Sequence, residues 1–196
     1  MSDPITKRVI DWNAARYDQE YDYELATNLL LEETQELFDA KTAVDKLDAI
    51  GDITFVAIGV LWKLGFSERQ IYDIFYVHDL TKISPAEAQH WLMNVQSIAM
   101  DLINHEQPGS WPGLVHALYS VFNTALSALR GMKCQNIFYD VVHTICDSND
   151  TKEIKGKTPA NVKANIDKGT SYKPPTDALF TLYSISISGT YIKGVQ

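Results

Sequence analysis

Residues 22–64 read DYELATNLLLEETQELFDAKTAVDKLDAIGDITFVAIGVLWKL, and this stretch decides the fold. Its apolar spacing predicts two helices, over 22–40 and 43–64, and Gly65 provides a stop for the second. Because the link between them is short, the two helices should be antiparallel neighbours. The run from Ile53 to Trp62 is apolar nearly all round, which indicates a central helix. The stretch therefore predicts an all-α protein built as an antiparallel helical bundle.

Five carboxylates lie on faces of these two helices that the pattern predicts to be buried. At about 100° per residue, the three glutamates share the stripe of Leu25, Leu29 and Ala40, while the two aspartates lie one turn apart and align with Phe55 and Gly59. The five are Glu32, Glu33, Glu36, Asp48 and Asp52. An EExxE pattern on its own is usually a solvated face, but the apolar alignment and the second helix favour a binding site.

The physical consequence of such a cluster is a need for positive charge. Two charges about 5 Å apart repel by roughly 3 kcal/mol at an effective dielectric constant of about 20. Five clustered carboxylates would therefore protonate, splay apart or bind a hard cation. Oxygen-only clusters suit Mg²⁺ or Mn²⁺, which is the cofactor that we expect.

The composition indicates a single globular domain over residues 1–196. Of its 196 residues, 45% are hydrophobic, and the formal net charge of -8 argues against binding to long DNA or RNA. No run reaches ~18 consecutive apolar residues and the N-terminus lacks a signal-peptide pattern, so we expect a cytoplasmic protein with no membrane partner. Cys134 and Cys146 lie about 18 Å apart along one predicted helix, beyond disulfide reach, and are expected to be reduced core residues.

The rest of the chain divides into helices and a basic C-terminal part. Further helices are predicted over residues 4–18, 67–76, 84–105, 111–130 and 135–147. The region from about 66 to 133 carries no motif and is expected to be a helical insertion or a dimerisation region. Residues 148–196 are expected to form a basic loop and tail. Within them, residues 180–192 alternate apolar and small polar side chains, which favours an extended hairpin or tail over a helix.

The acidic pattern resembles that of the MazG-like all-α nucleoside triphosphate pyrophosphohydrolases, whose shared pattern is ExxE, a spacer, then ExxD. Glu33 and Glu36 fit the first half, and Asp52 fits the last position after a twelve-residue spacer. Ala49 stands where the family has its second-half Glu. Asp48, one position earlier, is the candidate replacement, because an i, i+4 pair also places two carboxylates on one helix face.

Three further motifs resemble the viral branch of this superfamily, which includes enzymes that remove (d)GTP. They are Trp12-Asn13-x-x-Arg16-Tyr17, Ser148-Asn149-x-x-Lys152 and Lys168-Gly169-x-x-Tyr172-Lys173-Pro174-Pro175. The resemblance implies an all-helical homodimer or homotetramer, in the host cytoplasm if the chain is viral. It also implies hydrolysis of a nucleoside triphosphate, with a purine such as (d)GTP favoured, to the monophosphate and pyrophosphate.

The resemblance also implies roles for individual residues. Glu33, Glu36 and Asp52 would be metal ligands, with Glu32 and Asp48 as further ligands or as the base. The substrate-binding candidates are Asn149, Lys152, Arg16, Asn13, Lys168, Tyr172 and Lys173. Lys152 would hold phosphate oxygens as a point charge, and Arg16 is a weaker candidate for the same task. Trp12, Tyr17 and Trp62 are aromatic residues that would stack on a base or fill the core.

Two other interpretations stay open. Glu87-x-x-His90 matches the ExxH unit of ferritin-like di-iron proteins, and Asp140-x-x-His143 is a near match. That fold needs two true ExxH units and leaves the glutamate cluster unexplained. The other alternative is a catalytically inactive, nucleotide-binding helical protein that has lost turnover through Ala49.

Overall fold

The computed structural model describes residues 4–76, 125, 127–153, 156–159, 161–163 and 168–188, and within these ranges the chain is helical without a strand. The all-α prediction is therefore confirmed. The named elements are α1 (Pro4–Ala14), α2 (Tyr23–Asp39), α3 (Ala43–Lys63), α4 (Glu68–Tyr76), the 3-10 helix η1 (Gln135–Ile137), α7 (Phe138–Asp150) and α8 (Thr176–Ile187). No helix in the described part of the chain is both long and apolar enough to cross a membrane.

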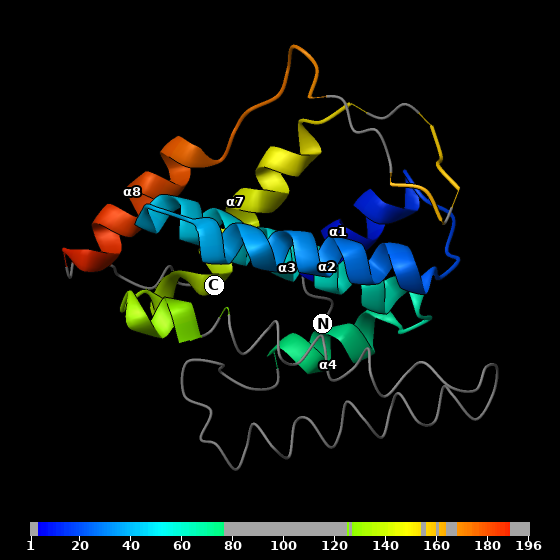
Figure 1. Cartoon of the computed structure of the whole chain (residues 1–196), viewed down its shortest axis with the longest axis horizontal. Coiled ribbons are helices and arrows are strands. Elements are labelled where there is room, and N and C mark those ends of the chain that lie inside the picture. Colours follow the sequence, from blue (N-terminus) through cyan, green and yellow to red (C-terminus); the bar gives the residue numbers. More distant parts are fainter. Residues whose placement is uncertain are drawn as a thin grey trace.

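Helix α3 is the central element, as its sequence predicts. It packs against α1, α2, α4, α7 and α8. Figure 1 shows α2 running along α3, with α7 and α8 toward the top of the view and α4 toward the bottom. Leu47, Ile50 and Ile53 of α3 are completely buried. Burial of such side chains stabilises the fold by about 1.5–3 kcal/mol each.

Local hydrogen bonds define the turn between α2 and α3. Thr42 caps α3, because its Oγ1 accepts from the Asp45 backbone N–H and Asp45 Oδ2 accepts from the Thr42 N–H at 2.9 Å. These bonds lower the pKa of Asp45. At the other end of α2, Asp22 is the N-cap and accepts from the Leu25 N–H at 2.8 Å. The two helices are thus an antiparallel pair with the expected bounds to within a residue or two.

Several predicted bounds differ from the structure. Helix α1 ends at Ala14 rather than at residue 18, and the chain then turns back. Cys134 precedes η1, so the prediction that both cysteines lie in one helix is wrong, although both are buried and free as expected. The helix predicted over residues 67–76 is α4, which begins at Glu68 and ends at Tyr76. Residues 84–105 and 111–124 of the other predicted helices lie outside the described residues.

The prediction of extended structure is wrong for residues 180–187, which belong to α8. Two of the small polar residues bond within the helix, because Ser184 Oγ donates to the Phe180 carbonyl at 2.8 Å and Thr181 Oγ1 donates to the Asp177 carbonyl at 2.9 Å. Ser186 Oγ instead donates to Asn136 Oδ1 at 3.1 Å. Leu179 anchors α8 in the core. Residues 189–192 lie outside the described part.

Candidate active site

The acidic cluster lies where α2 and α3 run side by side, but its members differ in burial. Asp48, Asp52 and Glu33 are half-buried, whereas Glu32 and Glu36 are exposed. The prediction that all five lie on buried faces is therefore wrong for those two. The buried face of α2 consists of Ala26, Leu30 and Leu37. This buried face is rotated about the helix axis from the stripe of Leu25 and Leu29. Glu33 therefore lies at the edge of the buried face, and Glu32 and Glu36 lie outside it.

The carboxylates nevertheless act on one another. Burial raises the pKa of Glu33 to about 8, assisted by the charges of Asp52, Glu36 and Glu32. Burial and the charges of Asp48 and Glu36 raise the pKa of Asp52 to about 7. The pKa of Asp48 is also raised, first by burial and then by Glu36. All five predicted acids therefore belong to one electrostatic unit.

Asp48 and Ala49 lie on different faces of α3. Ala49 is only 3% exposed and belongs to the core, whereas Asp48 is half-buried and its charge raises the pKa of Asp52. A side chain at position 49 faces the interior of the bundle, whereas Asp48 and Asp52 share a face of α3 one turn apart.

A cavity of about 200 Å³ adjoins the cluster. Helix α2 and its N-cap line the cavity with Asp22, Leu25, Ala26, Leu29 and Glu33. From α3 it is lined by Asp52, Phe55, Val56, Gly59, Val60 and Lys63. These positions recur every three to four residues, so one stripe of each helix forms a wall. Of the five acids, Glu33 and Asp52 line this cavity.

The end of α1 and the residues after it form a third wall, from Trp12, Asn13 and Tyr17. Asn13 packs against α3 at Gly59, where an added Cβ would come within 2.9 Å of both polar atoms of the Asn13 amide. Asn13 Nδ2 donates to the Val9 carbonyl at 2.8 Å. Trp12 meets Phe55 edge to face, with 5.1 Å between ring centroids. Two of the predicted aromatic residues thus reach the cavity.

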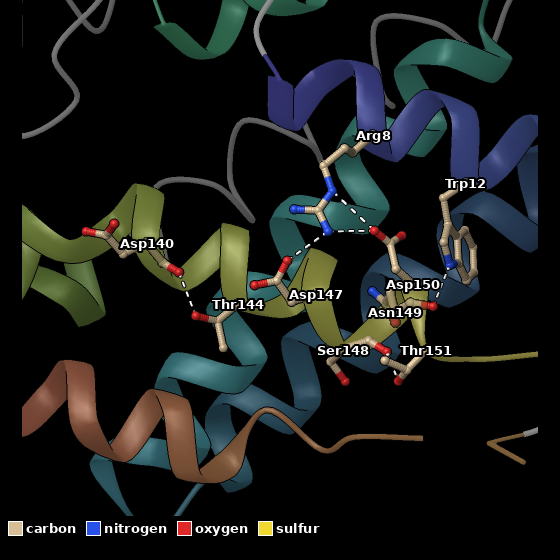
Figure 2. A network of polar contacts seen from close by, with 9 residues as sticks. All are labelled: Arg8, Trp12, Asp140, Thr144, Asp147, Ser148, Asn149, Asp150 and Thr151. Atoms are coloured by element: carbon tan, nitrogen blue, oxygen red, sulfur yellow. Dashed lines mark hydrogen bonds and ion pairs between the residues drawn. The ribbon is translucent and has the colours of Figure 1, made fainter. Parts of the chain in front are cut away.

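The C-terminal end of α7 contributes Asn149 and Lys152, both predicted from the sequence. Figure 2 shows how α1 holds this end: Trp12 Nε1 donates to the Asn149 carbonyl at 2.9 Å, and Arg8 bonds to Asp147 and Asp150 at 2.8 and 2.5 Å. The side-chain amide of Asn149 has no hydrogen bond to another described residue. It is therefore available to a ligand in the cavity.

Lysines surround the acidic end of the cavity. Lys152 and Lys163 line it, and Lys163 Nζ lies 2.5 Å from Glu32 Oε2. The charges of Lys152 and Lys168 each oppose the rise in the pKa of Asp52. Both ammonium groups also lie over the ring of Tyr172, at 5.9 and 4.9 Å from its centroid. Lys168 and Tyr172 thus gather beside the acids without lining the cavity.

Two predicted substrate-binding residues have other contacts. Arg16 is 5% exposed, donates from Nη2 to the Lys152 carbonyl at 2.9 Å and stacks over the Trp12 ring at 4.0 Å. Burial lowers its pKa. Lys173 is exposed, and its backbone N–H donates to Thr151 Oγ1 at 2.9 Å. Neither lines the cavity, and Arg16 instead fixes the backbone that carries Lys152.

Sequence reasoning missed two cavity lysines. Lys163 belongs to the basic segment after α7, and the lysine-rich composition of that segment was the only indication that it could reach the site. Lys63 continues the α3 stripe of Asp52, Val56 and Gly59, so helical spacing places it on the cavity wall. Lys63 also lies in the last turn of α3, where a cation is favourable whatever its function.

The carboxylate chemistry fits a hard divalent cation, because the acids are oxygen donors whose mutual repulsion a cation relieves. Among the described residues, however, no three His, Cys, Asp or Glu side chains are arranged as a metal site. Asp140 and His143 lie on α7, whereas Glu87 and His90 of the di-iron interpretation lie outside the described residues.

Comparison of the chain with models of known protein families, with curated proteins and with solved structures gave no match. The chemistry of the site therefore has to carry the functional interpretation.

Proposed function

We propose that the protein hydrolyses a nucleoside triphosphate to the monophosphate and pyrophosphate, with Mg²⁺ or Mn²⁺. One observation carries the proposal: a single cavity combines mutually repelling acids, cationic groups and an aromatic wall. Glu33 and Asp52 supply the acids, and Lys152 supplies a cation beside them. Trp12 and Phe55 provide the wall. A triphosphate with its metal and its base needs these three environments in one place.

The acidic residues would hold the metal. Glu33, Glu36 and Asp52 are the proposed ligands, with Glu32 and Asp48 beside them. When bound, the ion neutralises charge on the phosphates and lowers the pKa of a water molecule. The carboxylate that is not used as a ligand accepts the proton of the attacking water, a task for which a pKa raised toward neutrality is suited.

The lysines and amides bind the rest of the substrate. Lys152 and Lys163 bind phosphate oxygens as point charges, and the side-chain amide of Asn149 donates beside them. Lys168, placed over Tyr172, adds positive charge at the same end. Trp12 and Tyr17, which line the cavity, are the proposed aromatic contacts of the base.

We also propose self-association into a homodimer or homotetramer. Leu31 and Phe38 on α2 are 60% and 68% exposed, which supports an apolar contact there. Light scattering after gel filtration measures the mass, and a monomer at all concentrations would contradict this assembly. A cytoplasmic location stays a prediction.

The central experiment incubates the purified protein with each canonical NTP and dNTP plus Mg²⁺ or Mn²⁺ and quantifies monophosphate, pyrophosphate and orthophosphate. We expect monophosphate and pyrophosphate in equal amounts. Glu36→Gln and Asp52→Asn should abolish turnover and metal affinity while circular dichroism stays unchanged. Glu24→Gln is the matched control, because Glu24 is an exposed acid in the first turn of α2.

Release of orthophosphate instead of pyrophosphate would contradict the proposed reaction. Normal turnover by Asp52→Asn would show that the site is elsewhere. Tight nucleotide binding without turnover would instead identify a nucleotide-binding protein that is not an enzyme.

A further inference from the structure

The cavity has two chemically different ends. Glu33 and Asp22 line it from the α2 side, and Asp52 and Lys63 line it from α3. In each pair the residues are eleven positions apart, which is about 16 Å along a helix. Because the helices are antiparallel, Glu33 lies toward Asp52 and Asp22 lies toward Lys63. The electrostatics agree, since Asp52 raises the pKa of Glu33 and Asp22 counteracts the lowering of the Lys63 pKa.

The segment between these ends is apolar. Leu25 and Leu29 lie between them on α2, and Phe55 and Val56 lie between them on α3. An extended ligand whose phosphates occupy the acidic end would therefore pass an apolar stretch before it meets Lys63. A nucleotide has this order of parts: charged phosphates, a sugar, then a base with a polar edge.

Lys63 carries N–H donors that no other described residue accepts. Its ammonium lies 4.1 Å from the centroid of the Tyr17 ring, which holds it at the cavity wall. It has no hydrogen bond or ion pair with another described residue, and burial lowers its pKa. Nearby, Asp22 uses Oδ1 to accept from the Leu25 N–H and has no second described donor. This end therefore offers one strong donor and one strong acceptor.

We propose that Lys63 and Asp22 recognise the base of the nucleotide and favour a base that carries a carbonyl oxygen next to a ring N–H, as in guanine, uracil and thymine. This inference rests on the proposed function. The carbonyl accepts from Lys63, and the adjacent N–H donates to the Asp22 carboxylate. Both partners are charged, so both hydrogen bonds are of the stronger kind.

Adenine and cytosine fit this pair less well. Each has an exocyclic amino group in place of the carbonyl, and that donor would repel the Lys63 ammonium. Turning the base places the amino group at Asp22, but then the partner of Lys63 is a ring nitrogen instead of a carbonyl oxygen. Two correct hydrogen bonds to a base edge favour that base over the wrong one by about tenfold or more.

The test compares kcat/KM for GTP and UTP with kcat/KM for ATP and CTP in the intact protein. We expect a preference of about tenfold or more for the carbonyl bases. Lys63→Met should reduce it to within about threefold of unity, whereas Lys63→Arg keeps it. Lys41→Met is the matched control, because Lys41 is exposed in the link after α2.

A second variant guards against misfolding of Lys63→Met. Asp22→Asn keeps the N-cap of α2, since Asn and Asp cap equally well, but it removes the carboxylate. It should also reduce the preference. Turnover without a preference in the wild-type protein, or a preference that survives in both Lys63→Met and Asp22→Asn, would overturn this inference and leave the proposed reaction standing.

Calorimetric binding of GMP, UMP, AMP and CMP separates the remaining cases. If no nucleotide is hydrolysed but GMP and UMP bind more tightly in a Lys63-dependent manner, the proposed reaction fails and the base-recognition end stands. If none of the four monophosphates binds and none of the triphosphates is hydrolysed, both are overturned.

Discussion

Gly51 of α3 lies against Ile145 of α7 so closely that a Cβ atom on Gly51 would overlap Ile145 Cγ1. This contact sets the distance between the helix that carries Asp52 and the helix that carries Asn149. The absence of a side chain at Gly51 thus allows Asp52 and Asn149 to line the same cavity.

Gly51→Ala should therefore destabilise the protein, although alanine favours a helix. Overpacking costs about 1–3 kcal/mol, and most of this range exceeds the propensity gain of about 1 kcal/mol. Urea unfolding measures the free energy of unfolding. Gly131→Ala is the control, because a Cβ there meets nothing within 4 Å. A Gly51→Ala protein as stable as the control would contradict the close packing.

The metal-free protein should lose stability as the pH rises. In the unfolded chain Glu33 ionises near its ordinary pKa of 4.5, whereas the native state retains the proton until about pH 8. Between these values the native state binds more protons, so the contribution of Glu33 to the free energy of unfolding is full below pH 4.5 and is lost through pH 8. Glu33→Gln should flatten the decline.

Urea unfolding in EDTA at about pH 5 and about pH 8.5 measures this difference. Adding Mg²⁺ at the higher pH should stabilise the wild-type protein more than the Glu33→Gln variant. A ligand that binds the native state raises the free energy of unfolding, and the variant lacks one of the proposed metal ligands. Parallel pH dependence in the two proteins would rule out Glu33 as the source.

Replacing Ala49 by Glu completes the ExxD pattern that the sequence resembles, but it should not raise turnover. Ala49 is in the core, so a buried carboxylate there should cost about 3 kcal/mol or more. Asp48→Asn, in contrast, should keep the fold and lower turnover at least tenfold, roughly the size of a perturbed metal shell. Thermal unfolding and pyrophosphate release measure the two effects. A stable and more active Ala49→Glu would show that Asp48 is not the substitute.

Trp12→Phe should weaken both stability and substrate binding. It removes the donor to the Asn149 carbonyl, a buried bond of 2.9 Å, at a cost of about 1–2 kcal/mol. Because this hydrogen bond positions the backbone that carries Asn149 and Lys152, KM for the nucleotide should rise. Trp62→Phe removes the same volume without loss of a hydrogen bond between described residues. Equal KM values in the two variants would contradict a positioning role for Trp12.

Much of the fold follows from local sequence signals. The bounds of α2 and α3 are predictable because their caps, Asp22 and Thr42, and the apolar run of α3 are local features. The rotation of α2 about its axis is not predictable in this way, because its buried face depends on the helices that it contacts. For this reason Glu32 and Glu36 are exposed, although the pattern placed them on a buried face. In α8, Ser184 belongs to a pattern that resembles a strand but bonds to a carbonyl of its own helix, and Ser186 bonds to the side chain of Asn136.

The site was predictable to a similar extent. Asn13, Asn149 and Lys152 line the cavity as their motifs suggest. The role of Arg16 depends on the Lys152 carbonyl, which is distant in sequence and near only after folding. Helical spacing places Lys63 on the cavity wall, but its contact with Tyr17 is tertiary and no local pattern encodes it.

The bonds from Trp12 and Arg16 to the end of α7 also impose an order on biosynthesis. The carboxylates of α2 and α3 leave the ribosome long before Lys152 and Lys163, which partner them in the folded chain. A nascent chain that ends before α7 therefore carries the acids without these counter-charges. It also lacks the Asn149 and Lys152 carbonyls, which accept from Trp12 and Arg16 in the folded protein. The cavity can be completed only when the last third of the chain has been made, so a truncated product retains the acidic motif and lacks the site.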